Sequence, residues 1–282
     1  MQSKRYGIVC DVGKCDGCYS CFLSCKDEYV GADHLPFSSA QSEGQAWIRV
    51  DEIEYGAGSK IKVDYVTVMC QHCDKPACMK AAPEGAVYKR PDGVVIIDPV
   101  KAKGAKEIAD ACPYRCIFWN EESDLPQKCT MCIHMLESGE KLPRCVECCP
   151  TGARVFGDLS DPESVISKLV AEQKDRLEVL HPEFGTNPAV KYLRLPKPFI
   201  SGDVYYADTN DCAGGVMVTL RHMETGALRT TETNFLGSFE FRDVAENGEY
   251  ELMVAADSYR PRTLPARVKG GENLGGIALE KA

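Results

Sequence analysis

Cysteine spacing constrains this 282-residue chain more than any other feature, because 16 of its residues are cysteines. One set has gaps of two, two and three residues: Cys15, Cys18, Cys21 and Cys25. A second set has gaps of two, twelve and three residues and ends before a proline: Cys129, Cys132, Cys145 and Cys149. Such spacing puts several thiols on one short loop, so the fold must be built around whatever the thiols bind.

The first spacing is that of bacterial iron–sulfur proteins, in which three thiolates hold one [4Fe-4S] cluster and the fourth reaches a different cluster. Each run therefore needs a mate, and the second run supplies the same three-plus-one set. Exchange of the last ligands predicts cluster 1 on Cys15, Cys18, Cys21 and Cys149. It predicts cluster 2 on Cys25, Cys129, Cys132 and Cys145.

A third run lacks its fourth cysteine. It retains Cys70, Cys73 and Cys78, and the position where the fourth belongs holds Ala82. The segments 82–86 and 149–153 read Ala-Pro-Glu-Gly-Ala and Cys-Pro-Thr-Gly-Ala. The two segments share their proline, glycine and last alanine, so the chain itself marks position 82 as an emptied ligand site.

The mate of this third run retains only Cys112, which precedes a proline. Counting back with the gaps of the first run gives three positions without cysteine. If each run gives its last ligand to the cluster of the other run, the surviving cysteines all belong to cluster 3. The four lost positions then all belong to one other cluster, which has been deleted. The sequence therefore predicts three [4Fe-4S] clusters, the third on Cys70, Cys73, Cys78 and Cys112. It also predicts a filled, apolar space around the four lost positions: Ala82, Ala102, Ala105 and Ile108.

Zinc and disulfides are the alternatives to iron and sulfur. Zinc sites also use paired Cys-x2-Cys units, but a zinc ribbon has no use for the third and fourth cysteines of the first run. A disulfide scaffold is typical of secreted proteins, and no apolar signal segment follows Met1. Reduced ligand thiols indicate a cytoplasmic location. No stretch is long and apolar enough for direct membrane insertion.

Four cysteines lie outside the predicted ligand sets: Cys10, Cys116, Cys148 and Cys212. Free cysteine usually packs as a small apolar side chain, and we expect this for all four. Cys148 is the one rival ligand, since it neighbours Cys149. The gap of three residues and the proline that follows favour Cys149.

The charge of the chain, 33 basic against 42 acidic residues, argues against nucleic acid as a partner. The sequence contains no glycine-rich dinucleotide fingerprint and no phosphate loop.

The five histidines are dispersed and form no catalytic set, so we expect no catalytic residue on this chain. His72 and His134 lie in or beside the cysteine loops, where packing is favoured over tuning of a cluster.

The sequence divides into three parts. Residues 1–158 indicate an α+β ferredoxin-like domain with duplicated 4Fe-4S motifs, with strands at 6–10 and 93–98. An insertion at about 29–69 has no cysteine and predicts a hairpin within 47–54. Residues 159–198 indicate a helix, which starts at a capping box over 160–163, and a connector. Residues 199–282 indicate an all-β sandwich.

Short apolar runs at regular spacing make up the last part: 204–206, 216–220, 227–233, 238–241, 250–254 and 274–279. Glycine and Asp punctuate these runs, as in a small sandwich. The pattern resembles transthyretin-like, immunoglobulin-like domains, which serve adhesion and interaction. This part of the sequence offers no metal or catalytic set, so we expect a docking domain.

Residues 1–158 resemble the four-cluster electron-transfer subunits of molybdopterin oxidoreductases of the dimethyl-sulfoxide-reductase family, with one cluster deleted. Nearly the whole chain is similar to the small subunits of pyrogallol–phloroglucinol transhydroxylases. The segments that carry this likeness include 98–104, 111–114, 119–122, 127–132 and 232–239. Cys116 and the twelve-residue gap before Cys145 depart from the family pattern without changing the ligand count.

The resemblance implies a partner and a division of labour. A large catalytic subunit, in a heterodimer or higher oligomer, holds molybdenum on two pterin dinucleotides and binds a polyhydroxylated aromatic. This chain then supplies the [4Fe-4S] clusters for electron transfer.

Three other functions stay open. The first is the same role in a catechol dehydroxylase or another molybdopterin oxidoreductase. The second is a free polyferredoxin-like carrier, which would gain little from a docking domain. The third is a zinc-bound scaffold, which has no visible iron–sulfur absorption. The substrate is not readable from this sequence, because its site is expected on another chain.

Overall fold

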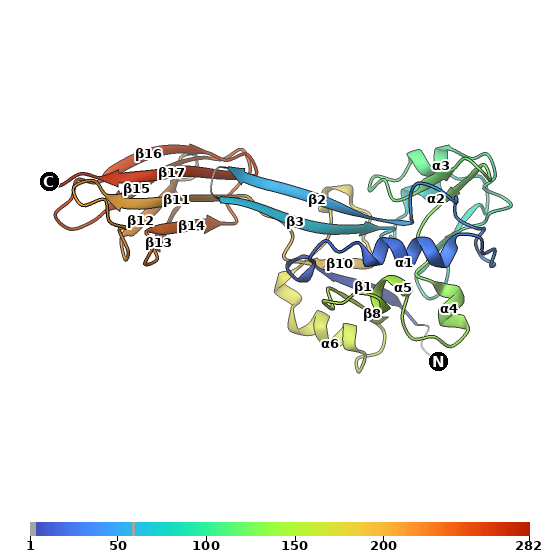
Figure 1. The fold of residues 1–282 in the computed structure, drawn as a ribbon. Coiled ribbons are helices and arrows are strands. Elements are labelled where there is room, and N and C mark those ends of the chain that lie inside the picture. Colours follow the sequence, from blue (N-terminus) through green and yellow to red (C-terminus); the bar gives the residue numbers. More distant parts are fainter. Residues whose placement is uncertain (1–3, 58–59) are drawn as a thin grey trace. The chain divides into compact units, whose positions relative to one another are not determined.

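The computed structural model describes residues 4–57 and 60–282, which divide into two compact units (Figure 1). The first unit joins the described residues up to Glu52 with Asp64–Leu195. The second unit joins Ile53–Val63 with Pro196–Ala282. The sequence places domain boundaries at 158 and 199, whereas this division runs through the insertion and then at Pro196.

A four-stranded sheet with the order β8-β1-β10-β9 forms the centre of the first unit. Strand β1 (Tyr6–Asp11) is buried over its middle four residues, which confirms the strand expected at 6–10. It pairs antiparallel with β8 (Arg154–Asp158) and parallel with β10 (Val190–Leu193). Strand β9 (Leu177–Glu178) pairs with β10. Pairing on both edges of β1 fixes the start of the cysteine loop that follows it.

Short helices and hairpins carry the other cysteine loops of this unit. Helix α1 (Ser20–Tyr29) packs on α5, and α2 packs on α3. The expected strand at 93–98 is confirmed as β5, which pairs with β4, and β6 pairs with β7. Every helix among the described residues is too short or too polar to span a bilayer. The bounds are α2 (Ala77–Ala81), α3 (Glu107–Asp110), α4 (Ile133–Glu137), α5 (Arg144–Glu147), β4 (Val87–Lys89), β5 (Val95–Ile97), β6 (Phe118–Asn120), β7 (Leu125–Gln127), and 3-10 turns at Val12–Lys14, Lys174–Arg176 and Pro182–Phe184.

The insertion contains a two-stranded sheet of β2 (Ile48–Ala57) and β3 (Lys60–Met69). The hairpin predicted within 47–54 is therefore wrong in extent, because that stretch is one strand. Gly56, near the end of β2, has a φ of +99°, which favours glycine. An added Cβ there would lie 2.1 Å from the carbonyl oxygen of Lys60.

Helix α6 (Val165–Glu172) begins at Ser164, whose hydroxyl accepts a hydrogen bond from the Ser167 amide at 3.2 Å. The capping box predicted over 160–163 is therefore wrong by about one turn. Asp158 explains the difference, because its carboxylate accepts hydrogen bonds from the amide and the hydroxyl of Ser160. Ser160 is thus engaged in a turn ahead of the helix.

The second unit is a sandwich of two sheets, ordered β14-β11-β17 and β13-β12-β15-β16. Alternate residues of its strands face a shared core, as period-two side-chain alternation requires. The sequence misses β16, which contains Pro265 and lies at a sheet edge, where proline is tolerated. The strands are β11 (Phe199–Tyr206), β12 (Met217–His222), β13 (Leu228–Glu232), β14 (Ser238–Arg242), β15 (Glu249–Ala255), β16 (Arg262–Arg267) and β17 (Gly271–Leu279).

Residues of β3 and the sandwich form ion pairs inside this second unit. Lys60 pairs with Asp203 at 3.1 Å, and Lys62 pairs with Glu240 at 2.6 Å. The insertion therefore contributes residues to the β unit as well as to the unit that carries the cysteines.

Gly237 allows a stability test of the sandwich. Its φ is +77°, and an added Cβ would lie 2.1 Å from the carbonyl oxygen of Val204. Gly226 has a similar φ of +71° but faces open space. We expect Gly226→Ala to cost about 1 kcal/mol through backbone strain alone, and Gly237→Ala roughly 3 kcal/mol. Amide hydrogen exchange in β11 and β14 of the full chain measures the difference; equal protection in the two variants would contradict the close approach.

Candidate metal centre

Four cysteines predicted to act together line one cavity of the first unit: Cys15, Cys18, Cys21 and Cys149. The first two lie on the loop after β1, and Cys149 follows α5. Gly17 permits this loop, because its φ is +70° and an added Cβ would lie 2.5 Å from the ring of Tyr65. Cys18 is exposed, so this cavity lies close to the surface.

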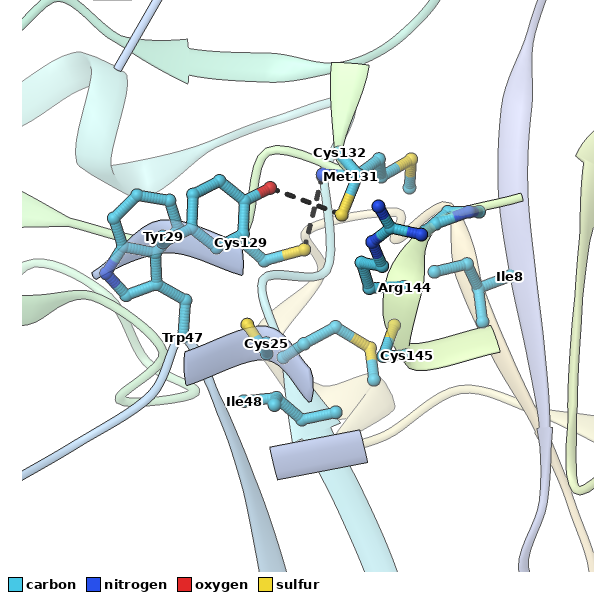
Figure 2. A pocket seen from close by; sticks show the side chains of 12 residues that line it. Ile8, Cys25, Tyr29, Trp47, Ile48, Cys129, Met131, Cys132, Arg144 and Cys145 are labelled. Atoms are coloured by element: carbon cyan, nitrogen blue, oxygen red, sulfur yellow. Dashed lines mark hydrogen bonds between the residues drawn. The ribbon is translucent and has the colours of Figure 1, made fainter. Parts of the chain in front are cut away.

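A second cavity is lined by the next predicted set: Cys25, Cys129, Cys132 and Cys145 (Figure 2). Tyr29 and Trp47 also line it and bring aromatic rings against the thiols. Three of these four cysteines are buried.

Helix α1 connects the two cavities. Cys21 and Cys25 are four residues apart on it and therefore on the same helical face. Cys21 lines the first cavity and Cys25 the second. Within the described residues, no three His, Cys, Asp or Glu side chains converge as the ligands of a single metal ion do. Four thiols instead surround each cavity.

Hydrogen bonds to the thiol sulfurs come from the loops themselves. The Met131 amide donates to Cys129 Sγ at 3.3 Å, and the Tyr29 hydroxyl donates to Cys132 Sγ at 3.3 Å (Figure 2). Met131 and Cys132 have φ values of 56° and 48°, which turn the loop inwards. Donors of this kind stabilise ligand thiolates and influence the potential of a cluster.

The third predicted set also lies together. Cys112 packs in the same apolar cluster as Cys78, and Cys70, Cys73 and Cys112 lie near enough to raise the pKa of Cys78. His72, between the first two cysteines, is buried and its Nδ1 accepts a hydrogen bond from the Val95 amide at 3.0 Å. The Nε2 atom of His72 has no hydrogen-bond partner among the described residues. The choice between packing and tuning of a cluster therefore stays a prediction.

Burial opposes ionisation of these thiols. It raises the pKa of Cys21 and Cys73 to about 11 and the pKa of Cys78 and Cys132 to about 12. It also raises the pKa of Cys25 well above the ordinary range. Metal ligation needs the thiolate form, so a bound cation must supply the compensating charge.

Lys128 is a buried positive charge beside the third set. Its side chain is 3% exposed, and its ammonium donates to the carbonyls of Val95 and Cys129. Its charge opposes the rise that burial causes in the pKa of Cys78, and it contributes to the lowered pKa of Cys112. The sequence gives no signal for this role, since a lysine before a cysteine is ordinary.

The four positions without cysteine converge. Ala82, Ala102, Ala105 and Ile108 pack in one apolar cluster with Cys78 and Cys112. Ala102 and Ile108 are fully buried. This confirms the expected filled space and places it next to the third set.

The other four cysteines take separate positions. Cys10 and Cys116 are buried, as expected, whereas Cys212 is exposed, so the expectation is wrong there. Cys148 bonds to the Ser24 hydroxyl at 3.0 Å and is not among the residues that line the first cavity, unlike Cys149. The Cys116 amide donates to Cys112 Sγ at 3.5 Å, and hydrogen bonding from Cys116 lowers the pKa of Cys112 to about 6.

Arg154 is a residue of the site that the sequence does not mark. It lines the first cavity and is 4% exposed. Its Nε and Nη1 atoms have no hydrogen-bond partner among the described residues. An anionic group in the cavity would satisfy both atoms, and a [4Fe-4S] cluster on four thiolates is such a group. The residues of the first cavity therefore fit a cluster of this kind.

Comparison with known proteins agrees with this site. Residues 61–159 match the family described as 4Fe-4S dicluster domain, and residues 200–277 match the carboxypeptidase regulatory-like domain. One subunit of the tetrathionate reductase of Salmonella typhimurium is 35% identical over 70% of this chain and 75% of its own length. One subunit of the sulfite dehydrogenase of Allochromatium vinosum is 35% identical over 67% of this chain and 82% of its own length.

The chain therefore belongs to the family of iron–sulfur electron-transfer subunits of molybdopterin oxidoreductases, in which it is a non-catalytic subunit. Within this family it is similar over most of its length to the pyrogallol hydroxytransferase small subunit of Pelobacter acidigallici. The two are 37% identical over 90% of this chain and 92% of that protein. The resemblance noted from the sequence is thereby confirmed.

Packing around the four converged positions gives a test. Ile108 is fully buried, so Ile108→Ala should lower the free energy of unfolding by about 2 to 5 kcal/mol. That corresponds to roughly 5 to 15 °C in the unfolding midpoint for a protein of this size. Val100, 82% exposed, is the control, and Val100→Ala should leave the midpoint unchanged. Circular dichroism under anaerobic conditions measures both; an unchanged midpoint for Ile108→Ala would mean that the space is not tightly filled.

Proposed function

We propose that this chain binds three [4Fe-4S] clusters on the twelve cysteines assigned above. The single observation that carries the proposal is that two of the predicted ligand sets line two separate cavities without a foreign cysteine. Neither set is contiguous in sequence, because each takes one ligand from the other run. The dense thiol clusters, the hydrogen-bond donors and the unpartnered Arg154 support the same assignment.

The arrangement of helices supports a duplicated ferredoxin-like core. Helix α1 carries ligands of two sets and packs on α5, which carries Cys145. In the same way α2 carries Cys78 and packs on α3, which precedes Cys112. Two such pairs would have held four clusters. The second pair keeps one, and alanine and isoleucine side chains occupy the place of the other.

The function that fits best is electron transfer to a molybdenum enzyme that acts on polyhydroxylated aromatics. A bound [4Fe-4S] cluster supplies one-electron transfer. The thiols of this chain hold each cluster in place, the loop amides and Tyr29 donate to the ligand sulfurs, and the apolar walls exclude water. The catalytic partner is a larger subunit with molybdenum on two pterin dinucleotides, in a heterodimer or higher oligomer, and a cytoplasmic location suits the reduced thiols.

The reaction favoured for the complex is transhydroxylation, as the name of the Pelobacter acidigallici relative suggests. The alternative is reductive dehydroxylation or another reaction of a molybdopterin oxidoreductase. The β unit is proposed as a docking domain for the large subunit, since it contributes no ligand cysteine. A free carrier is the weaker alternative, because it would gain little from a docking domain.

Neighbouring cysteines test the ligand assignment. Wild-type protein should contain about 12 iron atoms per chain, four for each of three clusters. Cys149→Ala should lose one cluster, about 4 irons, whereas Cys148→Ala, its matched control, should keep about 12. Iron and labile sulfide are measured on anaerobic samples. Equal iron loss in the two variants, about 16 irons in the wild type, or zinc in place of iron would each refute the assignment.

The need for an electron supply separates the two candidate reactions. Transhydroxylation consumes no net electrons, so the clusters would only set the molybdenum in its reduced state. A dehydroxylase receives two electrons for each product. The complex is pre-reduced, freed of reductant and given pyrogallol with a tetrahydroxybenzene. We expect sustained turnover; activity that stops after a few equivalents and resumes only with added donor would identify a dehydroxylase.

A further inference from the structure

Arg154 is a buried cation whose hydrogen bonds the protein does not satisfy. A guanidinium stays charged in proteins and carries five N–H donors. Nη2 of Arg154 reaches Met69 Sδ at 3.7 Å, and thioether sulfur is a weak acceptor. Nε and Nη1 have no partner, and no carboxylate pairs with this side chain among the described residues. Such a group is costly to bury unless an anion completes its contacts.

The position of Arg154 shows where that anion would lie. Strand β8 follows the second cysteine run and places Arg154 opposite Cys10 of β1, the strand that precedes the first run. Its side chain lines the first cavity. It also interacts electrostatically with Cys21 of the first set and Cys145 of the second. The charge thus lies beside the first cavity.

The second cavity has no equivalent free cation among the residues that line it. Arg144 lines it, but Arg144 Nε bonds to Glu28 at 2.7 Å and Nη1 bonds to Glu147 at 2.8 Å. These carboxylates neutralise its charge. The Tyr29 hydroxyl and the Met131 amide, which donate to thiols of that cavity, are neutral.

We propose that Arg154 donates its free N–H groups to sulfur atoms of cluster 1 and raises the reduction potential of that cluster above the potential of cluster 2. This inference rests on the proposed function, since it needs the clusters in their assigned cavities. Reduction adds a negative charge to an already anionic group, so a fixed cation and N–H donors both favour the reduced form. In this scheme Arg154 adjusts the potential of the cluster and does not touch the substrate.

The consequence is a direction for the electron. An electron that enters the chain would come to rest at cluster 1, the cluster whose ligand Cys18 is exposed. Cluster 2, at the second cavity, would be reduced only after cluster 1. A fixed charge that lines only the first of the two cavities therefore orders the reduction of their clusters.

The test is a redox titration of the complex, followed by electron paramagnetic resonance, on Arg154→Gln and Arg154→Lys. We expect Arg154→Gln to reduce the ratio of reduced to oxidised cluster 1 about tenfold at the wild-type midpoint, which is about 59 mV for a one-electron couple. Arg154→Lys keeps the charge without the planar fork and should show a smaller shift in the same direction. The signal of cluster 3 should not move. Arg144→Gln is the matched control and should leave cluster 1 unchanged.

Iron content separates the possible failures. A wild-type complex without iron–sulfur clusters would overturn the proposed function itself. A fully loaded Arg154→Gln variant whose potentials match those of the wild type would overturn only the role of Arg154. If Arg154→Gln does not assemble, Arg154→Lys decides: a loaded cluster 1 with a lowered potential supports the proposal, and an unchanged potential contradicts it. Loss of cluster 1 from both variants also contradicts it, because a residue that only adjusts a potential is not needed for assembly.

Discussion

Burial of thiols that must ionise is the constraint on which the first unit depends. Water would stabilise a thiolate, but the core that surrounds these cysteines excludes it, and the pKa of Cys25 rises well above the ordinary range as a result. A bound metal cluster reverses this penalty, because it replaces the lost solvation with coordination bonds. The helices of this unit are short, the longest having ten residues. The loops between them are therefore expected to depend on the metal for much of their order.

Helix α1 links the first two predicted ligand sets, because it carries one cysteine of each. Its two cysteines are one turn apart, yet each lines a different cavity. One rigid helix therefore sets the separation of two redox centres, and a mobile linker could not do so. The same logic explains why α1 packs on α5, which supplies a ligand to the second cavity from the other run.

The ligand sets could be predicted because close spacing leaves a signal in the sequence, and the emptied positions could be predicted because they follow the same count. The full length of the hairpin was not predicted. The first half of β3 alternates polar and apolar residues as a strand does, but Ile61 and Val63 are exposed while Lys60 and Lys62 are partly buried, so the pattern does not mark a buried face. Arg154 could not be predicted either. Its residue type is ordinary for a strand, and only the three-dimensional contacts reveal that its donors are unpartnered. The helix is capped by Ser164 and not by the predicted Ser160, because the amide and hydroxyl of Ser160 donate hydrogen bonds to Asp158. The capping-box motif does not include this interaction.

Parallel pairing of β1 with β10 has a consequence for biosynthesis. Strand β1 leaves the ribosome well before its partner Val190–Leu193, which is translated about 180 residues later. Contacts between segments so far apart form slowly compared with a local helix. The sheet cannot close until translation has passed the last ligand, so every cysteine of the three sets is synthesised before its fold is complete. The nascent chain is therefore most open to iron delivery, and most exposed to oxidation, during that interval.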